Sequence, residues 1–289
     1  MKIIDAHIHF SHIESFHHTA GNLSMIDYSE KGYEKEFTEA GVVFSIAMGL
    51  REIEGGEGFP DRAPSTPMGI DLATRIPRGM AVCQGVNPYR LEKEDLERLE
   101  RELLKPETAG IKIYLGYYPF YAYDKVYGPV YELATAYNLP VVFHTGDTYS
   151  ERGLLKYAHP LTIDETAVAN RNVTFVMAHF GDPWMLDAAE VVYKNRNVYA
   201  DLSGLIVGEE QEAGRIRNTP HFFDHFKHAL AFCDNYDKLI FGTDWPLVRV
   251  QPYVDFIRAH IPHDHHEDVF YNTALRVFPK IRPLLPDQS

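Results

Sequence analysis

The sequence of 289 residues predicts an α/β fold, a (β/α)8 barrel in which eight parallel strands alternate with helices. Two observations lead to this prediction. Short apolar runs of strand length recur along the whole chain, and stretches with the amphipathic spacing of helices lie between them. A doubly wound open sheet is the alternative arrangement of the same elements. Since the chain has no linker composition and no repeat, we expect residues 1–289 to form a single barrel domain.

Eight segments have the pattern of a strand. Most are nearly continuous apolar runs, which is typical of strands buried on both faces of a parallel sheet. They occupy, in order, residues 2–9, 42–49, 79–86, 109–116, 139–146, 172–181, 197–204 and 238–246.

Amphipathic segments of helical length separate several of these strands. They comprise residues 91–105, 126–137, 184–194 and 221–232; the first has leucines on one face and charged residues on the others. Two long connections, 51–68 and 204–220, follow the second and seventh strands. There they would lie over the strand ends, as lids or as irregular surface loops.

The composition excludes several classes of protein. The chain has 28 Lys and Arg against 41 Asp and Glu, a formal net charge of −13, which argues against nucleic acid as a partner. No stretch approaches the roughly 20 apolar residues of a membrane span, and Asp5 and two histidines stand where a signal peptide would be apolar. We therefore expect a cytoplasmic protein. Cys83 and Cys233 lie in apolar surroundings and are expected to be buried free thiols.

Candidate metal ligands stand where predicted strands end. His7 and His9 alternate in the first strand, so the pleat points both toward the barrel interior. His144, His179 and Asp244 end the fifth, sixth and eighth strands, each followed by turn residues. Because the ends of barrel strands converge on one rim, these five side chains are expected to meet.

The order of the motifs identifies a family resemblance. The chain is similar over nearly its whole length to the amidohydrolase superfamily, in its amidohydrolase-2 (metal-dependent hydrolase) branch. The segments that carry the resemblance are DAHIH (5–9), GIK (110–112), GPVYELA to LPVVFHTG (128–146), MAHFG (177–181) and GTDWP (242–246).

The resemblance implies a distorted (β/α)8 barrel, a divalent metal, usually zinc, and either hydrolysis of a C–N or C–O bond or nonoxidative decarboxylation. By position, His7, His9, His144 and Asp244 would be the metal ligands. His179 would face the substrate or lie behind the ligands in a mononuclear site, or bind a second metal in a binuclear one.

The residue types agree with these roles. Neutral imidazoles with a carboxylate suit zinc with an open position for water, whose pKa then falls to about 7. Asp244 could accept the proton of that water and His179 could polarise a carbonyl. The leading hypothesis is a hydrolase of a small amide, ester or lactone that bears a carboxylate or a ring. The alternatives are a decarboxylase of an aromatic or unsaturated acid and a metal-binding protein without activity.

Lys112 decides between one metal and two. Binuclear members of the superfamily carry a bridging carboxylated lysine on the fourth strand, whereas the branch resembled here mostly keeps a single metal. We favour one metal, with Lys112 as a charged partner of Asp244 or of a substrate carboxylate. A lysine that only shapes the barrel floor through a salt bridge is the simpler alternative.

The substrate pocket is expected to be partly aromatic. An aromatic cluster that includes Tyr114 and Tyr118 follows the fourth strand and could form a pocket wall or a subunit contact. Arg51 and Arg249 each follow a strand and could clamp a carboxylate, or could simply be solvated. A homodimer is the expected assembly.

Overall fold

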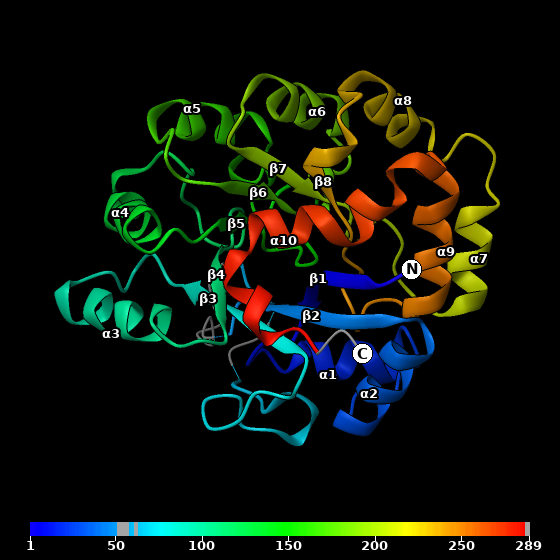
Figure 1. Cartoon of the computed structure of the whole chain (residues 1–289), viewed down its shortest axis with the longest axis horizontal. Coiled ribbons are helices and arrows are strands. Elements are labelled where there is room, and N and C mark those ends of the chain that lie inside the picture. Colours follow the sequence, from blue (N-terminus) through cyan, green and yellow to red (C-terminus); the bar gives the residue numbers. More distant parts are fainter. Residues whose placement is uncertain (51–57, 61–62, 287–289) are drawn as a thin grey trace.

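The computed structural model describes residues 1–50, 58–60 and 63–286, and in it the strands follow one another around a barrel (Figure 1). All eight strands pair in parallel, in the order β1 to β8. The strands are β1 Ile3–His9, β2 Val42–Met48, β3 Met80–Val86, β4 Thr108–Ile113, β5 Val141–Phe143, β6 Phe175–Met177, β7 Val198–Asp201 and β8 Leu239–Ile240.

Backbone hydrogen bonds join the segment that follows β8 to β1. The Ala6 N–H donates to the Phe241 carbonyl at 2.9 Å, and the His9 N–H donates to the Trp245 carbonyl at 2.6 Å. The predicted (β/α)8 barrel is therefore confirmed, and the open sheet is not found.

Helices surround the barrel (Figure 1). They are α1 Ser15–Asn22, α2 Glu30–Glu39, α3 Lys93–Leu103, α4 Gly128–Tyr137, α5 Leu161–Ala169, α6 Met185–Lys194, α7 Glu210–Arg217, α8 Asp224–Cys233, α9 Val250–His260 and α10 Thr273–Val277. Each of the four predicted helices is present with small shifts of its ends. In the described part of the connection from β2 to β3, the only helical element is a 3-10 turn at Pro67–Gly69. No helix in the described ranges is both long and apolar enough to cross a membrane.

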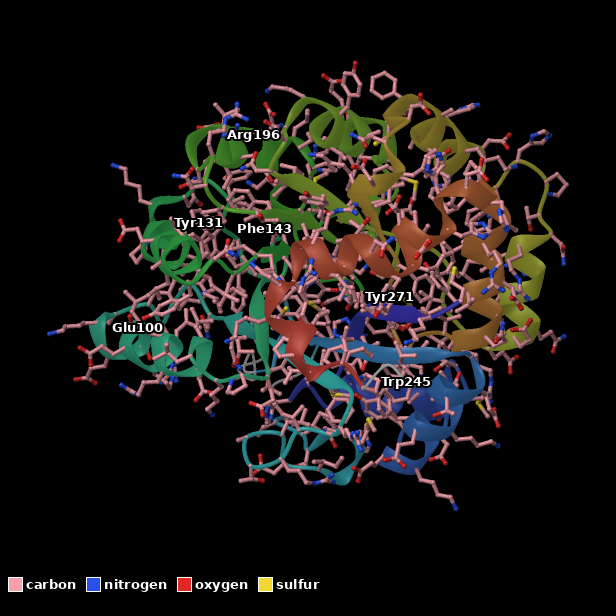
Figure 2. The ribbon with its side chains drawn as sticks, viewed as in Figure 1. Glu100, Tyr131, Phe143, Arg196, Trp245 and Tyr271 are labelled. Carbon is pink, nitrogen blue, oxygen red and sulfur yellow. The ribbon has the colours of Figure 1, made fainter. Side chains whose placement is uncertain are left out.

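Apolar side chains fill both sides of the strand layer. In the outer layer, Phe143 of β5 meets Tyr131 of α4, with ring centroids 6.3 Å apart (Figure 2). Inside the barrel, alternate strand residues pack with α10, which lies across one end (Figure 1). This inner cluster consists of Ile4, Ala6, Phe44, Ile46, Met48, Ala81, Cys83, Ala109, Val142, Val176, Ile240, Ala274, Val277, Phe278 and Ile281.

An irregularity in β1 places its histidines at the other end of the interior. The pairing register with β2 shifts between Asp5 and Ile8. Ala6 belongs to the inner cluster, whereas Ile8 packs in the outer layer. The shift lets His7 and His9 face the interior above Ala6, where the rings of this histidine pair lie 5.4 Å apart. Such local irregularities commonly re-aim side chains next to sites.

Candidate metal and catalytic site

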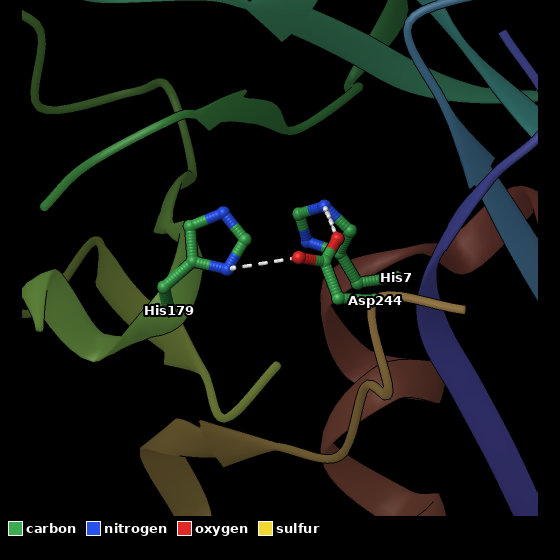
Figure 3. Close-up of side chains that lie close together, drawn as sticks. All are labelled: His7, His179 and Asp244. Atoms are coloured by element: carbon green, nitrogen blue, oxygen red, sulfur yellow. Dashed lines mark ion pairs between the residues drawn. The ribbon is translucent and has the colours of Figure 1, made fainter. Parts of the chain in front are cut away.

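Five buried side chains meet at the C-terminal ends of the strands. Each of His7, His9, His144, His179 and Asp244 is at most 9% exposed. His9 Nε2 lies 2.8 Å from Asp244 Oδ1. His7 Nε2 lies 3.5 Å from the same oxygen, and His179 Nδ1 lies 3.9 Å from Asp244 Oδ2 (Figure 3). One donor atom each of His7, His179 and Asp244 lie within 4.8 Å of one another, a spacing at which they could hold a metal ion.

The turns after β6, β7 and β8 have unusual backbone conformations. His179 and Asp244 have φ values of 60° and 70°, in the left-handed region that residues with a Cβ seldom adopt. Gly204, after β7, has a φ of 71°. A Cβ on Gly204 would stand 2.8 Å from His179 Nδ1 and 2.9 Å from Asp244 Oδ2, so only glycine leaves room for both side chains.

Asp201, at the end of β7, organises the site from beneath. Its Oδ2 accepts a hydrogen bond from His7 Nδ1 at 2.8 Å, and its Oδ1 accepts from the His179 N–H at 3.1 Å. The Ser203 hydroxyl also donates to Oδ1, at 2.5 Å. The sequence analysis did not single out Asp201 or Ser203, although the rule that selected Asp244, a carboxylate at a strand end, applies equally to Asp201.

Hydrogen-bond partners fix which ring nitrogens carry protons. His144 Nε2 lies 2.8 Å from the Asp147 carbonyl, which can only accept, so Nδ1 of His144 presents a lone pair. Because the Ser203 hydroxyl proton goes to Asp201, Ser203 Oγ must accept from His179 Nδ1, 2.9 Å away. His179 Nε2 then presents a second lone pair, only 3.2 Å from His144 Nδ1. Two facing lone pairs at this distance call for a shared cation.

Burial of the histidines favours a metal ion over a proton as the shared cation. Burial lowers the pKa of His7, His9, His144 and His179, which disfavours a proton on any of these rings. Burial by itself raises the pKa of Asp244, but the surrounding imidazoles outweigh it and hold that pKa well below its usual value. The site thus offers neutral imidazoles and an ionised carboxylate, the donor set of a borderline divalent metal. His7 Nε2 has no hydrogen-bond partner within the described ranges, as expected of a metal-binding nitrogen.

A cavity of about 150 Å³ opens above these side chains. Its lining within the described ranges consists of His9, Ile13, Ser15, Phe16, Phe59, Pro60, Tyr114, Tyr117, His144, Asp147, Tyr149, His179, Asp182, Gly204, Val207, Asp244 and Leu247. The two long connections both contribute, through Phe59 and Pro60 from one and Gly204 and Val207 from the other.

The remaining predicted site residues lie in different places. Lys112 is fully buried on β4, and its Nζ lies 5.2 Å from the centre of the Tyr114 ring, which lines the cavity. Tyr118 is buried against Phe59 and is not part of the lining. Arg249 is exposed and donates to the Met25 carbonyl at 2.6 Å, outside the lining. Arg51 lies outside the described residues.

Sequence comparison assigns the family. An amidohydrolase family model matches residues 4–280, so the chain belongs to the amidohydrolase family, in its amidohydrolase-2 branch. This makes it an enzyme of a metal-dependent family. A search among curated proteins found no match.

Solved structures share the fold along almost the entire chain. An amidohydrolase from Burkholderia multivorans with bound zinc has 17% identity and a TM-score of 0.66, and the match covers 99% of this chain and 100% of that one. The 5-carboxyvanillate decarboxylase of Sphingomonas paucimobilis has 15% identity and a TM-score of 0.61, with coverage of 96% and 98%. A probable 2-pyrone-4,6-dicarboxylic acid hydrolase from Acinetobacter baumannii, with citric acid bound, has 15% identity and a TM-score of 0.58, with coverage of 96% and 100%. At these identities the likeness shows the barrel fold alone.

Proposed function

We propose that this protein is a metal-dependent hydrolase that cleaves an ester, lactone or amide bond of a small organic molecule. The observation that carries the proposal is the facing pair of lone pairs on His144 and His179, beside the ionised carboxylate of Asp244, at the base of a cavity. The hydrolase name of one compared structure supports the same reaction class.

The donor atoms support a single divalent cation, with zinc the best match to the ligand types. We propose that His7, His9, His144 and Asp244 hold it, and that His179 joins them because its Nε2 faces His144 Nδ1. When bound, the cation supplies Lewis acidity, which polarises a substrate carbonyl and lowers the pKa of a water molecule. Asp201 keeps His7 Nε2 unprotonated by accepting the proton on the other nitrogen.

The protein's own groups handle the proton. Asp244 lines the cavity as a carboxylate, so it can accept the proton of the attacking water and pass it to the leaving group. Lys112 places a buried positive charge near the base of the site, which partly offsets the charge of Asp201. Tyr114 and Tyr117 cover one wall, beside the His144 ring, and limit the entry of further water.

Nonoxidative decarboxylation of an aromatic acid is the second candidate. The flat aromatic wall could stack on a ring, and one compared structure is named as a decarboxylase. In that reaction Asp244 would take up a proton from a substrate hydroxyl or from water and deliver it to carbon as CO2 leaves.

Metal analysis and two separate assays test these readings. Protein purified without a histidine tag or added metal should contain about one zinc or manganese per chain. A panel of esters, lactones, amides and aromatic acids is then followed for cleavage products by chromatography and for CO2 release. Cleavage of an ester, lactone or amide bond without CO2 supports hydrolysis, and CO2 release supports the second candidate. Absence of metal, with no activity restored by added zinc or manganese, contradicts both.

Substitution of Asp244 tests the mechanism. Asp244→Asn should abolish turnover and keep the fold, judged by circular dichroism, because the amide cannot accept the proton. Asp255→Asn changes an exposed aspartate of α9 in the same way and should leave turnover unchanged. Retained turnover in Asp244→Asn would remove Asp244 from the mechanism.

We also propose that the protein acts in the cytoplasm as a homodimer without a nucleic-acid partner. The net charge of −13 supports the last point. Light scattering tests the dimer: a mass near 33.1 kDa, that of one chain, would contradict it.

A further inference from the structure

Two carboxylates stand at the cavity beyond the proposed metal ligands. Asp147 follows β5 and Asp182 follows β6, and both line the cavity. The Asp147 N–H donates to the Asp182 carbonyl at 2.7 Å, so the two residues are direct neighbours. Asp182 Oδ1 accepts from His225 Nε2 at 2.9 Å, and Asp147 Oδ1 accepts from the Thr148 N–H at 2.9 Å. These bonds hold both carboxylates in place.

Aromatic rings line the same cavity as these carboxylates. Phe16 stacks on the His9 ring, with centroids 4.1 Å apart. The ring centroids of Phe59 and Tyr117 lie 5.1 Å apart, and the Tyr117 centroid lies 4.8 Å from that of the His144 ring. The π faces of such rings carry a negative potential that attracts organic cations.

The charges of the lining are one-sided. Asp147, Asp182 and Asp244 contribute carboxylates, whereas the described residues of the lining include no lysine and no arginine. The segments 51–57 and 61–62, outside the described residues, contain two arginines and four acidic residues in the sequence. A substrate with a carboxylate remote from the reacting bond would therefore meet two further carboxylates and no described cationic side chain.

We propose that the cavity takes a substrate that carries a protonated amine or quaternary ammonium group, on the part of the molecule away from the bond that is cleaved. The inference rests on the proposed hydrolase function and names its substrate class. The reacting carbonyl lies at Asp244 and His179, and the cation lies between the aromatic faces and the carboxylates of Asp147 and Asp182. The volume of about 150 Å³, below the range of about 300–1,000 Å³ typical of ligand pockets, restricts the substrate to a compact molecule.

The test uses isosteric probes on the full metal-loaded chain. Choline and 3,3-dimethyl-1-butanol differ only in a charged nitrogen against a neutral carbon. Calorimetry at low salt should show choline bound roughly tenfold more tightly than the neutral alcohol. Asp147→Asn and Asp182→Asn should each reduce this preference roughly threefold. Asp255→Asn, remote from the cavity lining, should not change it.

The outcomes separate this inference from the proposed function. Equal binding of choline and the alcohol, or no binding of either probe at millimolar concentration, overturns the inference. Turnover provides an independent comparison, between acetylcholine and 3,3-dimethylbutyl acetate. Hydrolysis of neutral or anionic esters without a preference for the cation overturns the inference and leaves the hydrolase. A choline preference without hydrolysis of any substrate supports the charge recognition and contradicts the hydrolase.

Discussion

Replacing Gly204 with alanine should weaken metal binding by about tenfold, although Gly204 offers no donor atom. The new methyl group would stand 2.8 Å from His179 Nδ1 and 2.9 Å from Asp244 Oδ2, whereas ordinary contact begins at 3.4 Å. His179 must therefore withdraw from the new methyl group by about 3.4 − 2.8 = 0.6 Å, and Asp244 by about 3.4 − 2.9 = 0.5 Å.

The expected magnitude follows from these displacements. Loss of a group that orients metal ligands typically costs about 10–100-fold in metal affinity, and we expect a forced shift of two ligands by about half an ångström to fall at the lower end of this range. The backbone adds a separate effect, because alanine at a φ of 71° destabilises the fold by about 1–2 kcal/mol. Metal affinity and stability must therefore be measured separately.

Gly69 provides a matched control for the backbone effect. It has the same φ of 71°, and a Cβ there would meet no atom within 4 Å. Gly69→Ala should lose a similar amount of unfolding free energy but keep its metal affinity. The measurements are chelator competition for the affinity and urea unfolding for the stability. Equal metal affinities in Gly204→Ala and Gly69→Ala would refute the argument that the space beside Gly204 positions the site.

Three further predictions concern charge. Asp201→Asn should reduce metal affinity by about 10–100-fold in chelator competition, because an amide has a single acceptor oxygen and cannot accept from His7 on one side and from His179 and Ser203 on the other; unchanged affinity would contradict this role. Lys112→Met should keep about one metal per chain by elemental analysis while lowering turnover, and loss of a second equivalent would show a bridging lysine instead. After a chelator has removed the metal, the free energy of unfolding should decrease as the pH falls below about 6.5, the ordinary pKa of histidine. Burial lowers the pKa of His7, His9 and His144 in the folded chain, so the unfolded chain binds more protons at these residues. The free energy of unfolding therefore decreases as the pH decreases. A melting temperature that rises as the pH falls from about 7 to about 5 would argue against buried neutral imidazoles.

The sequence predicts the order of the strands better than where they end. Predicted residues 2–9 and 42–49 agree closely with β1 and β2, but 139–146 shrinks to Val141–Phe143 and 238–246 to Leu239–Ile240. Apolar periodicity continues past the last sheet hydrogen bond, because the turns that carry His144 and Asp244 are themselves buried. At the end of the barrel near α10, the buried residues are also strand residues. At the site, buried residues such as His144 and Asp244 lie in turns beyond the last paired strand residue.

Site residues were predictable where the chemistry of the side chain reveals the role. Histidines at strand ends stand out, and the five predicted groups do lie together. Gly204 and Ser203 were not predictable, because their contributions depend on neighbours from other strands. Tyr118 and Tyr114 have the same residue type and the same segment, yet only Tyr114 lines the cavity. Spacing along an irregular loop does not determine which ring faces inward.

Asp201 controls the site without lining the cavity. Because it is ionised and accepts the Ser203 hydroxyl proton, Ser203 can only accept from His179 Nδ1, and His179 Nε2 is left as a lone pair. The same carboxylate accepts from His7 Nδ1 and leaves His7 Nε2 as a lone pair as well. One buried charge on β7 therefore directs donor nitrogens from β1 and from the turn after β6 toward the same region. These lone pairs repel one another in the absence of a cation, and a bound metal removes that repulsion. The folded chain should therefore bind metal more tightly than any one of its histidines would alone.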